Sequence, residues 1–209
     1  MPPLRLCQKI RVKTMKEKLI RQIENHIPCN AQEAADKALI LQLLSAGDPS
    51  TRNNLHAHLT VSAWVVSPDR KKVLMAYHNL YNSWAWLGGH ADGNWNLEEV
   101  AEKEAREESG IQTLQLLSDV PISLEILNVS GHEKKGAYVS SHLHLNLTYL
   151  FEGDPAESLR VKPDENSRVG WIAVSEIAEK STEPWFVERI YSKLVKKVSD
   201  EFPPQEVDA

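Results

Sequence analysis

The hydrophobic period of the chain changes from helical spacing to two near Leu59, and this change most restricts the folds that the sequence can adopt. Before it, apolar residues recur every three or four positions in 15–26 and 30–44, which predicts two helices. From Leu59 the segment LTVSAWVVS alternates with a period of two, and VLMAYH follows the turn sequence SPDR, which predicts a β-hairpin. The chain therefore begins as a helical hairpin and continues into a domain built on a sheet.

The later sequence adds helices and strands to this domain. The expected strands are 122–129, 137–151 and 170–174, and the expected helices are 97–109 and 184–198. Residues 1–14 are expected to lack regular structure. The predicted division is a helical extension at 1–54, an α/β domain at 55–200 and a polar tail at 201–209.

Composition restricts the partners of the protein. The 209 residues are 42% hydrophobic, which is enough for a packed core, and carry a formal charge of -5. This charge predicts no general attraction to nucleic acid or to anionic membranes. Cys7 and Cys29 have neither a disulfide framework nor the spacing of a zinc site, and no apolar run is long enough for a membrane span or a secretory signal. These features predict a cytoplasmic protein.

The helix expected at 97–109 has clear end signals and many acidic residues. Asn96 and Glu99 have the spacing of a capping box, and Gly110 suits a left-handed C-terminal cap. On its outer face, Glu99–Lys103 and Glu102–Arg106 have the spacing of favourable ion pairs. These pairs explain about half of the acids as ordinary surface chemistry.

Three further glutamates lie on or beside the face that otherwise packs inward. The spacing of three and four residues brings the carboxylates of Glu104, Glu107 and Glu108 together. Like charges about 5–6 Å apart repel by roughly 3 kcal/mol at an effective dielectric constant near 20. Proton uptake, neutralisation by Lys and Arg, and binding of a hard cation such as Mg²⁺ each relieve this repulsion. The preceding Gly88 and Gly89 allow close backbone approach and favour the metal, because a backbone carbonyl there could complete its site.

The segment GGHADGNWNLEEVAEKEAREESGI resembles the signature of the Nudix hydrolase family, G-x5-E-x7-R-E-U-x-E-E-x-G-U, in which U is aliphatic. The sequence that leads into it, HLTVSAWVVSPDRKKVLMAYHNLYNSWAWLGGHADG, also resembles a bacterial Nudix subgroup of uncertain substrate. This resemblance implies an α/β/α sandwich of mixed sheet, to which the N-terminal helical hairpin is added. Two positions differ: Trp95 replaces the first glutamate and Lys103 replaces the arginine, which in the family commonly form an ion pair. We expect Asp92 to pair with Lys103 instead.

The resemblance also implies a reaction, namely hydrolysis of the pyrophosphate linkage in a nucleoside diphosphate that carries another group. It implies Mg²⁺, with Mn²⁺ as the alternative, held by Glu104, Glu107, Glu108 and the Gly89 carbonyl. The three glutamates are also the candidate catalytic residues, together with Glu165 in the segment KPDENSRVGW.

Two other functions share this fold. The changes at Trp95 and Lys103 suit a nucleotide-binding module without catalysis, whereas isopentenyl diphosphate isomerase would need a cysteine in the strand region, where the chain has none. The expected partners are a small nucleotide substrate and, through the apolar N-terminal hairpin, a second copy of the chain. The sequence does not identify the substrate.

Histidines are a second group of candidate ligands. His142 and His144 alternate along an expected strand, and His90 follows the glycine pair. We interpret each of them as structural or solvent-facing.

Overall fold

The computed structural model describes residues 3–134 and 136–204, with the backbone alone for 3–9 and 134. Contacts divide the chain into two compact units, and each is described by itself. Unit 1 contains Met1–Val61, His90–Val100 and Ser123–Leu147, and unit 2 contains Ser62–Gly89, Ala101–Ile122 and Thr148–Ala209. Two long strands, one short strand and one helix contribute residues to both units.

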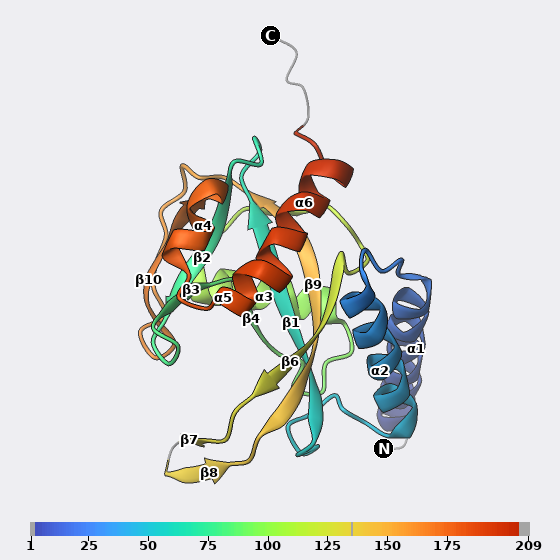
Figure 1. Ribbon diagram of the computed structural model, residues 1–209. Helices are drawn as coiled ribbons and strands as arrows, with labels where there is room; N and C mark the ends of the chain where they lie inside the picture. Colours follow the sequence, from blue (N-terminus) through green and yellow to red (C-terminus); the bar gives the residue numbers. More distant parts are fainter. Residues whose placement is uncertain (1–2, 135, 205–209) are drawn as a thin grey trace. The chain divides into compact units, whose positions relative to one another are not determined.

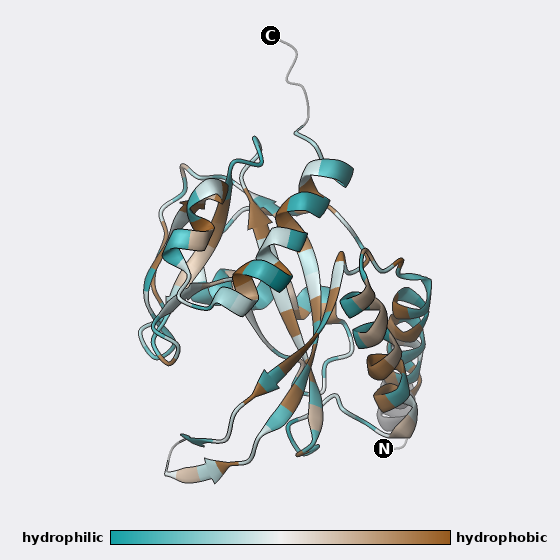
Figure 2. Ribbon diagram, in the orientation of Figure 1, coloured by the Kyte–Doolittle hydropathy of each residue, from teal (hydrophilic) through white to brown (hydrophobic). Residues whose placement is uncertain are grey.

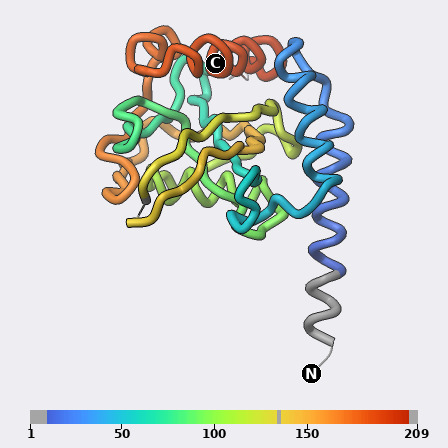
Figure 3. The backbone as a smooth tube through the Cα atoms, turned by 60° about the horizontal axis from the view of Figure 1, so that its bottom comes forward, coloured from blue at the N-terminus to red at the C-terminus, as the bar shows by residue number. Residues whose placement is uncertain are grey.

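Unit 1 is built from a helical hairpin and a group of strands. Its elements are α1 (Pro3–Asn25), α2 (Ala31–Ala46), β6 (Ser123–Val129), β7 (His132–Lys134), β8 (Ala137–Val139) and the first parts of β1 (Ala57–Val66) and β9 (His142–Gly153). The two helices lie side by side, and α2 packs against β6 (Figures 1 and 3). The predicted helical hairpin is therefore confirmed, but α1 begins at Pro3, so the expectation of irregular structure at 3–14 is wrong.

A buried carboxylate joins the hairpin to the strands. The side chain of Glu33 is fully buried and accepts hydrogen bonds from the N–H groups of Cys29 (2.8 Å) and Leu124 (2.9 Å) and from the Ser123 hydroxyl (3.2 Å). The His26 ring lies 3.0 Å from the same carboxylate. As the cap sequence predicts, the Glu33 N–H donates to the Asn30 side chain. The carboxylate, however, holds α2 against β6.

Unit 2 is a sheet with helices. Its elements are β2 (Lys72–His78), β3 (Ser83–Ala85), β4 (Leu87–His90, to Gly89), β5 (Leu114–Leu116), β10 (Asn166–Ala173), the last part of α3 (Leu97–Ser109), η1 (Val174–Glu176), α4 (Ile177–Lys180), α5 (Pro184–Phe186), the π-helical turn η2 (Val187–Tyr191), α6 (Ser192–Glu201) and the second parts of β1 and β9. The sheet order is β10-β2-β1-β9-β5, with β3 on β2. The predicted hairpin of β1 and β2 is antiparallel, with Val66 opposite Val73.

The sheet of unit 2 lies between helices, which agrees with the predicted α/β sandwich. Figures 1 and 3 show α3 on one side of the strands and α5–α6 on the other. Trp64 of β1 is fully buried and stacks on Tyr191 with 5.5 Å between ring centroids, which fixes the helical run to the sheet. Leu194 and Val198 of α6 are buried, whereas the turns of α6 that are visible in Figure 2 are mostly hydrophilic.

The strand predicted at 137–151 is two strands, β8 and β9. It breaks at Ser140 and Ser141, because the Ser141 hydroxyl accepts the Gly131 N–H and the Ser140 carbonyl lies 2.8 Å from His142 Nδ1. Side chains that bond to the backbone compete with strand pairing. Among the residues that the structure describes, none of the helices combines the length and apolarity needed to cross a membrane. Most of the expected tail, 205–209, lies outside the described residues.

Candidate active site

The acidic helix α3 runs from Leu97 to Ser109, as its end signals predict. Gly110 has a positive φ of 75°, and a Cβ at this position would lie 2.8 Å from the Cβ of Arg160. Glycine is therefore required here both for the backbone conformation and for space. On the outer face, the predicted pair Glu102–Arg106 forms with 2.7 Å between oxygen and nitrogen.

Glu108 is the buried member of the glutamate cluster, with 6% of its surface exposed. The Gly88 N–H donates to Glu108 Oε2 at 3.1 Å. The pKa of Glu108 is raised to about 8, mainly by burial and in addition by the negative charges of Glu165 and Glu104, against the opposing effect of the Gly88 hydrogen bond. A carboxyl in this environment holds a proton near neutral pH unless a cation takes its place.

Glu104 lies against the second glycine of the pair. A Cβ on Gly89 would lie 2.7 Å from Glu104 Cδ and 2.9 Å from Oε2, closer than side chains approach one another. The absence of a side chain at Gly89 thus lets the carboxylate rest on the backbone of β4. The pair Gly88–Gly89 consequently contacts two of the three predicted ligands, one through an N–H group and one through close packing.

Glu107 is held by two lysines instead of by the glycine loop. Lys103 Nζ lies 3.0 Å from Glu107 Oε1 and 3.3 Å from Glu104 Oε1, and Lys162 Nζ lies 3.6 Å from Glu107 Oε2. The hydrogen bond from Lys103 lowers the pKa of Glu107. The predicted pair Glu99–Lys103 is replaced by these contacts, and Glu99 accepts a hydrogen bond from the Asn96 side chain. Proton uptake and lysine neutralisation therefore both balance the cluster when it holds no cation.

The loop that carries Glu165 is fixed to the end of α3. The Asn166 side chain donates to the Glu108 carbonyl at 3.0 Å and accepts from the Lys162 N–H at 3.1 Å. Glu165 is 3.0 Å from Lys162 Nζ, and its charge acts on the pKa of Glu108. The structure thus brings Glu165 to the glutamate cluster.

Lys162 and Asn166 are the residues that sequence reasoning missed. Their only sequence signal is the dense polar composition of KPDENS, which is typical of any exposed turn.

The predicted pair of Asp92 and Lys103 is wrong. Asp92 binds Arg52 through two hydrogen bonds, and the nearby carboxylates of Glu104 and Glu107 take Lys103 instead. Trp95 is 5% exposed, and the Lys16 ammonium lies 5.1 Å from the centroid of its ring. The indole at this position is therefore a packed side chain.

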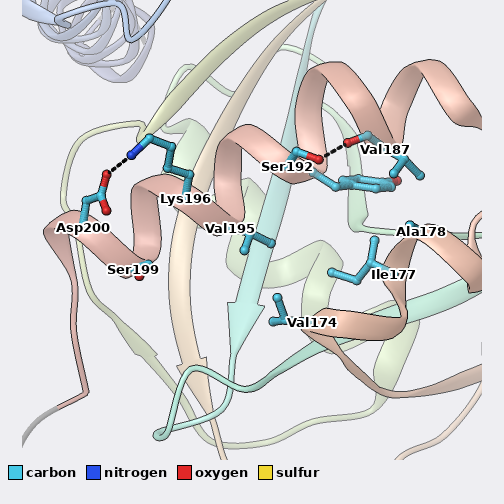
Figure 4. A pocket seen from close by; sticks show the side chains of 10 residues that line it. Val174, Ile177, Ala178, Val187, Ser192, Val195, Lys196, Ser199 and Asp200 are labelled. Atoms are coloured by element: carbon cyan, nitrogen blue, oxygen red, sulfur yellow. Dashed lines mark hydrogen bonds and ion pairs between the residues drawn. The ribbon is translucent and has the colours of Figure 1, made fainter.

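A separate groove of about 380 Å³ lies in unit 2 (Figure 4). Its lining residues come from η1, α4, η2 and α6, and they are Val174, Ile177, Ala178, Val187, Tyr191, Ser192, Val195, Lys196, Ser199 and Asp200. Three of its polar side chains are already paired, since Ser192 donates to the Val187 carbonyl and Lys196 pairs with Asp200. None of the predicted site residues lines it.

Comparison with known proteins decides the family. The family model described as the NUDIX domain matches residues 56–194, which is most of the chain. The chain belongs to the Nudix family. A comparison with curated protein sequences finds no match.

Solved structures of Nudix hydrolases share the fold. A Nudix-family hydrolase from Clostridium perfringens is 20% identical, with a TM-score of 0.48, and covers 68% of this chain and 96% of its own. An Ap4A hydrolase from C. elegans is 17% identical, with a TM-score of 0.49 and coverage of 68% and 95%. The Nudix hydrolase RenU from M. smegmatis is 15% identical, with a TM-score of 0.50 and coverage of 73% and 90%. The Nudix family match supports a pyrophosphohydrolase that acts on phosphorus-containing anhydrides.

Proposed function

We propose that this Nudix protein is an Mg²⁺-dependent hydrolase, with Mn²⁺ as an alternative metal, that cleaves the pyrophosphate linkage of a nucleoside diphosphate joined to another group. The observation that supports it most is the position of Glu104 and Glu108 against the glycine pair, with Glu108 buried and its pKa raised to about 8. Packing alone gives no reason for a carboxyl at that place, because an amide or an apolar side chain would avoid the cost of burying it.

The donor groups fit a hard divalent cation. The proposed ligands are the carboxylates of Glu104, Glu107 and Glu108 and the carbonyl of Gly89, and all of them offer oxygen, which Mg²⁺ and Mn²⁺ prefer. In the metal-free protein, the negative charge of these carboxylates is offset by a proton on Glu108 and by the ammonium groups of Lys103 and Lys162. A dication would take over this balance from the proton and from the lysines.

Each residue then has a defined task. When bound, the metal polarises the pyrophosphate and lowers the pKa of the attacking water. Glu108 keeps its oxygen aimed by the Gly88 N–H, and the bare backbone of Gly89 leaves room for Glu104. Lys162, released from Glu107, would be free to face a phosphate oxygen of the substrate.

Glu165 is our candidate for the group that accepts the proton of the water. Asn166 anchors its loop to α3, which places the carboxylate within electrostatic reach of Glu108. Before substrate binds, Glu165 forms an ion pair with Lys162, with 3.0 Å between the carboxylate oxygen and the ammonium nitrogen. A base needs this kind of fixed position near the water.

Isomerase chemistry has less support. Cys29 is exposed and lies between α1 and α2, away from every strand in sequence. A cytoplasmic location and a homodimer remain predictions.

The test is a panel of nucleoside diphosphate derivatives assayed with Mg²⁺ for release of phosphate-containing products. Glu108→Gln keeps the side-chain volume but removes a charged ligand, so we expect turnover to fall by at least about 100-fold. Glu98→Gln, on the first turn of the same helix, is the matched control and should keep wild-type turnover.

Thermal melts with and without Mg²⁺ test binding separately from turnover. Mg²⁺ should stabilise the wild type and Glu98→Gln, whereas the shift should shrink in Glu108→Gln. Wild-type turnover and an unchanged Mg²⁺-dependent shift in Glu108→Gln would reject the metal site. Mg²⁺ and nucleotide binding without any product would instead favour the non-catalytic binding module.

A further inference from the structure

Four histidines gather in unit 1, and one of them, His90, directly follows the glycine pair in the sequence. His58 lies on β1, His90 ends β4, and His142 and His144 begin β9. The ring centroid of His58 is 5.1 Å from that of His90 and 4.9 Å from that of His144, and the latter two are 4.9 Å apart. His142 adds a fourth ring, 4.7 Å from His58. Three strands therefore bring together His58 and the three histidines that we interpreted from the sequence as structural or solvent-facing.

Three of these rings lie close enough together to share one ion. One ring nitrogen from each of His58, His90 and His144 forms a set in which all atoms lie within 4.8 Å of one another. Nitrogens bound to one tetrahedral zinc at about 2.0–2.1 Å stand about 3.4 Å apart, so the rings would close by on the order of 1 Å. In the part of the chain that the structure describes, these histidines are the group of three candidate ligands with atoms this close together, and the glutamates of α3 do not form such a group.

Backbone carbonyls orient two of the rings. Nδ1 of His58 lies 3.2 Å from the Asn54 carbonyl, and Nδ1 of His142 lies 2.8 Å from the Ser140 carbonyl. A carbonyl only accepts, so each Nδ1 carries the hydrogen and each Nε2 keeps its lone pair. For His58, which belongs to the set of three, this is the support that metal-binding histidines receive from their surroundings.

The Nε2 lone pair of His58 accepts no hydrogen bond from the residues that the structure describes. The residue is 4% exposed, and its Nε2 has no hydrogen-bond partner among the described residues. A buried polar atom without a partner costs free energy, and such atoms are rare in folded proteins. An ion at the centre of the three rings would give this nitrogen its partner.

Two of the three rings, those of His58 and His144, are also in the protonation state that ligands need. Burial lowers the pKa of His58, and burial together with the neighbouring histidines lowers the pKa of His144 to about 2. These imidazoles are consequently neutral at physiological pH, and neutral imidazole is the form that binds metals.

We propose that His58, His90 and His144 bind a divalent transition metal of the zinc class. Imidazole ligands suit Zn²⁺, Co²⁺, Ni²⁺ or Cu²⁺, whereas Mg²⁺ selects oxygen, so this site differs in chemistry from the proposed glutamate site. Three protein ligands leave one tetrahedral position for water or for an oxygen of a bound molecule. His142, whose Nε2 is 3.3 Å from that of His144, stands beside this arrangement.

The experiment is metal binding by the full-length protein after treatment with a chelator. Co²⁺ titration followed by visible absorption reports tetrahedral nitrogen ligation, and competition with a chromophoric zinc chelator gives the Zn²⁺ affinity and stoichiometry. We expect one ion per chain. His144→Gln and His58→Gln should weaken Zn²⁺ binding by at least about 100-fold.

Two controls separate this site from other metal binding. His56→Gln changes an exposed histidine two residues from His58 and should keep the full Zn²⁺ affinity. Glu108→Gln should also keep it, which distinguishes this proposal from that for α3. If a buried variant does not fold, as judged by circular dichroism, the partly exposed His90→Gln replaces it. Wild-type Zn²⁺ affinity no higher than that of His144→Gln or His90→Gln, or a Co²⁺ spectrum without tetrahedral bands, would overturn the proposal.

Discussion

The ionised form of Glu108 is unfavourable in the metal-free protein and favourable when a cation is bound. Without a cation, its burial makes ionisation costly, and the pKa rises from its usual 4.5 to about 8. With a dication, the ionised form would be the favourable one. The same burial therefore destabilises the free protein above neutral pH and makes the site receptive to metal.

This cost predicts a pH dependence of stability. Because the folded pKa of Glu108 exceeds the unfolded one, the folded state binds more protons between pH 4.5 and 8, and the free energy of unfolding falls as pH rises through this window. One proton contributes a slope of at most about 1.4 kcal/mol per pH unit. Glu108→Gln has no such ionisation, so in metal-free buffer it should gain stability relative to the wild type from pH 5 to pH 8. Urea unfolding at both pH values measures this difference, and a constant difference would contradict it.

Trp95 is a residue whose role differs from that of the glutamate which it replaces in the signature. Its ring is buried and lies beneath the Lys16 ammonium. Trp95→Glu should lower the free energy of unfolding by about 3 kcal/mol or more, because it removes a packed ring and buries a charge. Mg²⁺ affinity, measured by calorimetry, should stay within a few-fold. A large gain in affinity would show that the missing carboxylate belongs to the metal site.

Among the elements, α3 was the easiest to predict and its surroundings were the hardest. Local signals at Asn96 and Gly110 mark its ends, and the structure agrees with them. The partner of Lys103 depends on which carboxylates the fold brings near, so neither Glu99 nor Asp92 was the right choice. Lys162 and Asn166 reach the site only through tertiary structure, and nothing near them in sequence indicates this.

The contact of α2 with β6 depends on Glu33. Its buried carboxylate accepts three hydrogen bonds from Cys29, Ser123 and Leu124. Glu33→Gln replaces one acceptor oxygen by a donor, so we expect the free energy of unfolding to fall by about 2–4 kcal/mol. Chemical denaturation measures it, with the exposed Glu24→Gln as the control. Equal stability of the two variants would show that this carboxylate does not hold the elements together.

At the scale of the whole molecule, periodicity predicted the fold class but not the gathering of distant residues. The change of hydrophobic period near Leu59 separated the helical hairpin from the sheet, and the Nudix signature indicated the α/β sandwich. The histidine cluster was not predicted, because His58 and His144 are far apart in the sequence and meet only when β1 and β9 come together.

We expect the N-terminal hairpin to be required for the stability and solubility of the protein. Removal of residues 1–46 uncovers β6 and leaves the Leu124 N–H without the Glu33 carboxylate. We expect the truncated protein to aggregate or to melt at a lower temperature than the full chain, and light scattering with thermal melts measures both. The mass of the full-length protein in the same experiment tests the predicted homodimer. A soluble monomer of unchanged stability after truncation would show that the hairpin is dispensable.

The Glu33 carboxylate also makes two backbone amides into reporters of motion. The N–H of Cys29 belongs to the loop between the helices, and the N–H of Leu124 belongs to β6, yet both donate to the same side chain. Neither amide hydrogen can exchange with solvent until its hydrogen bond to the carboxylate breaks. If the hairpin opens as one body, both amides should exchange with deuterium at the same rate. That rate would then measure how often α2 separates from β6.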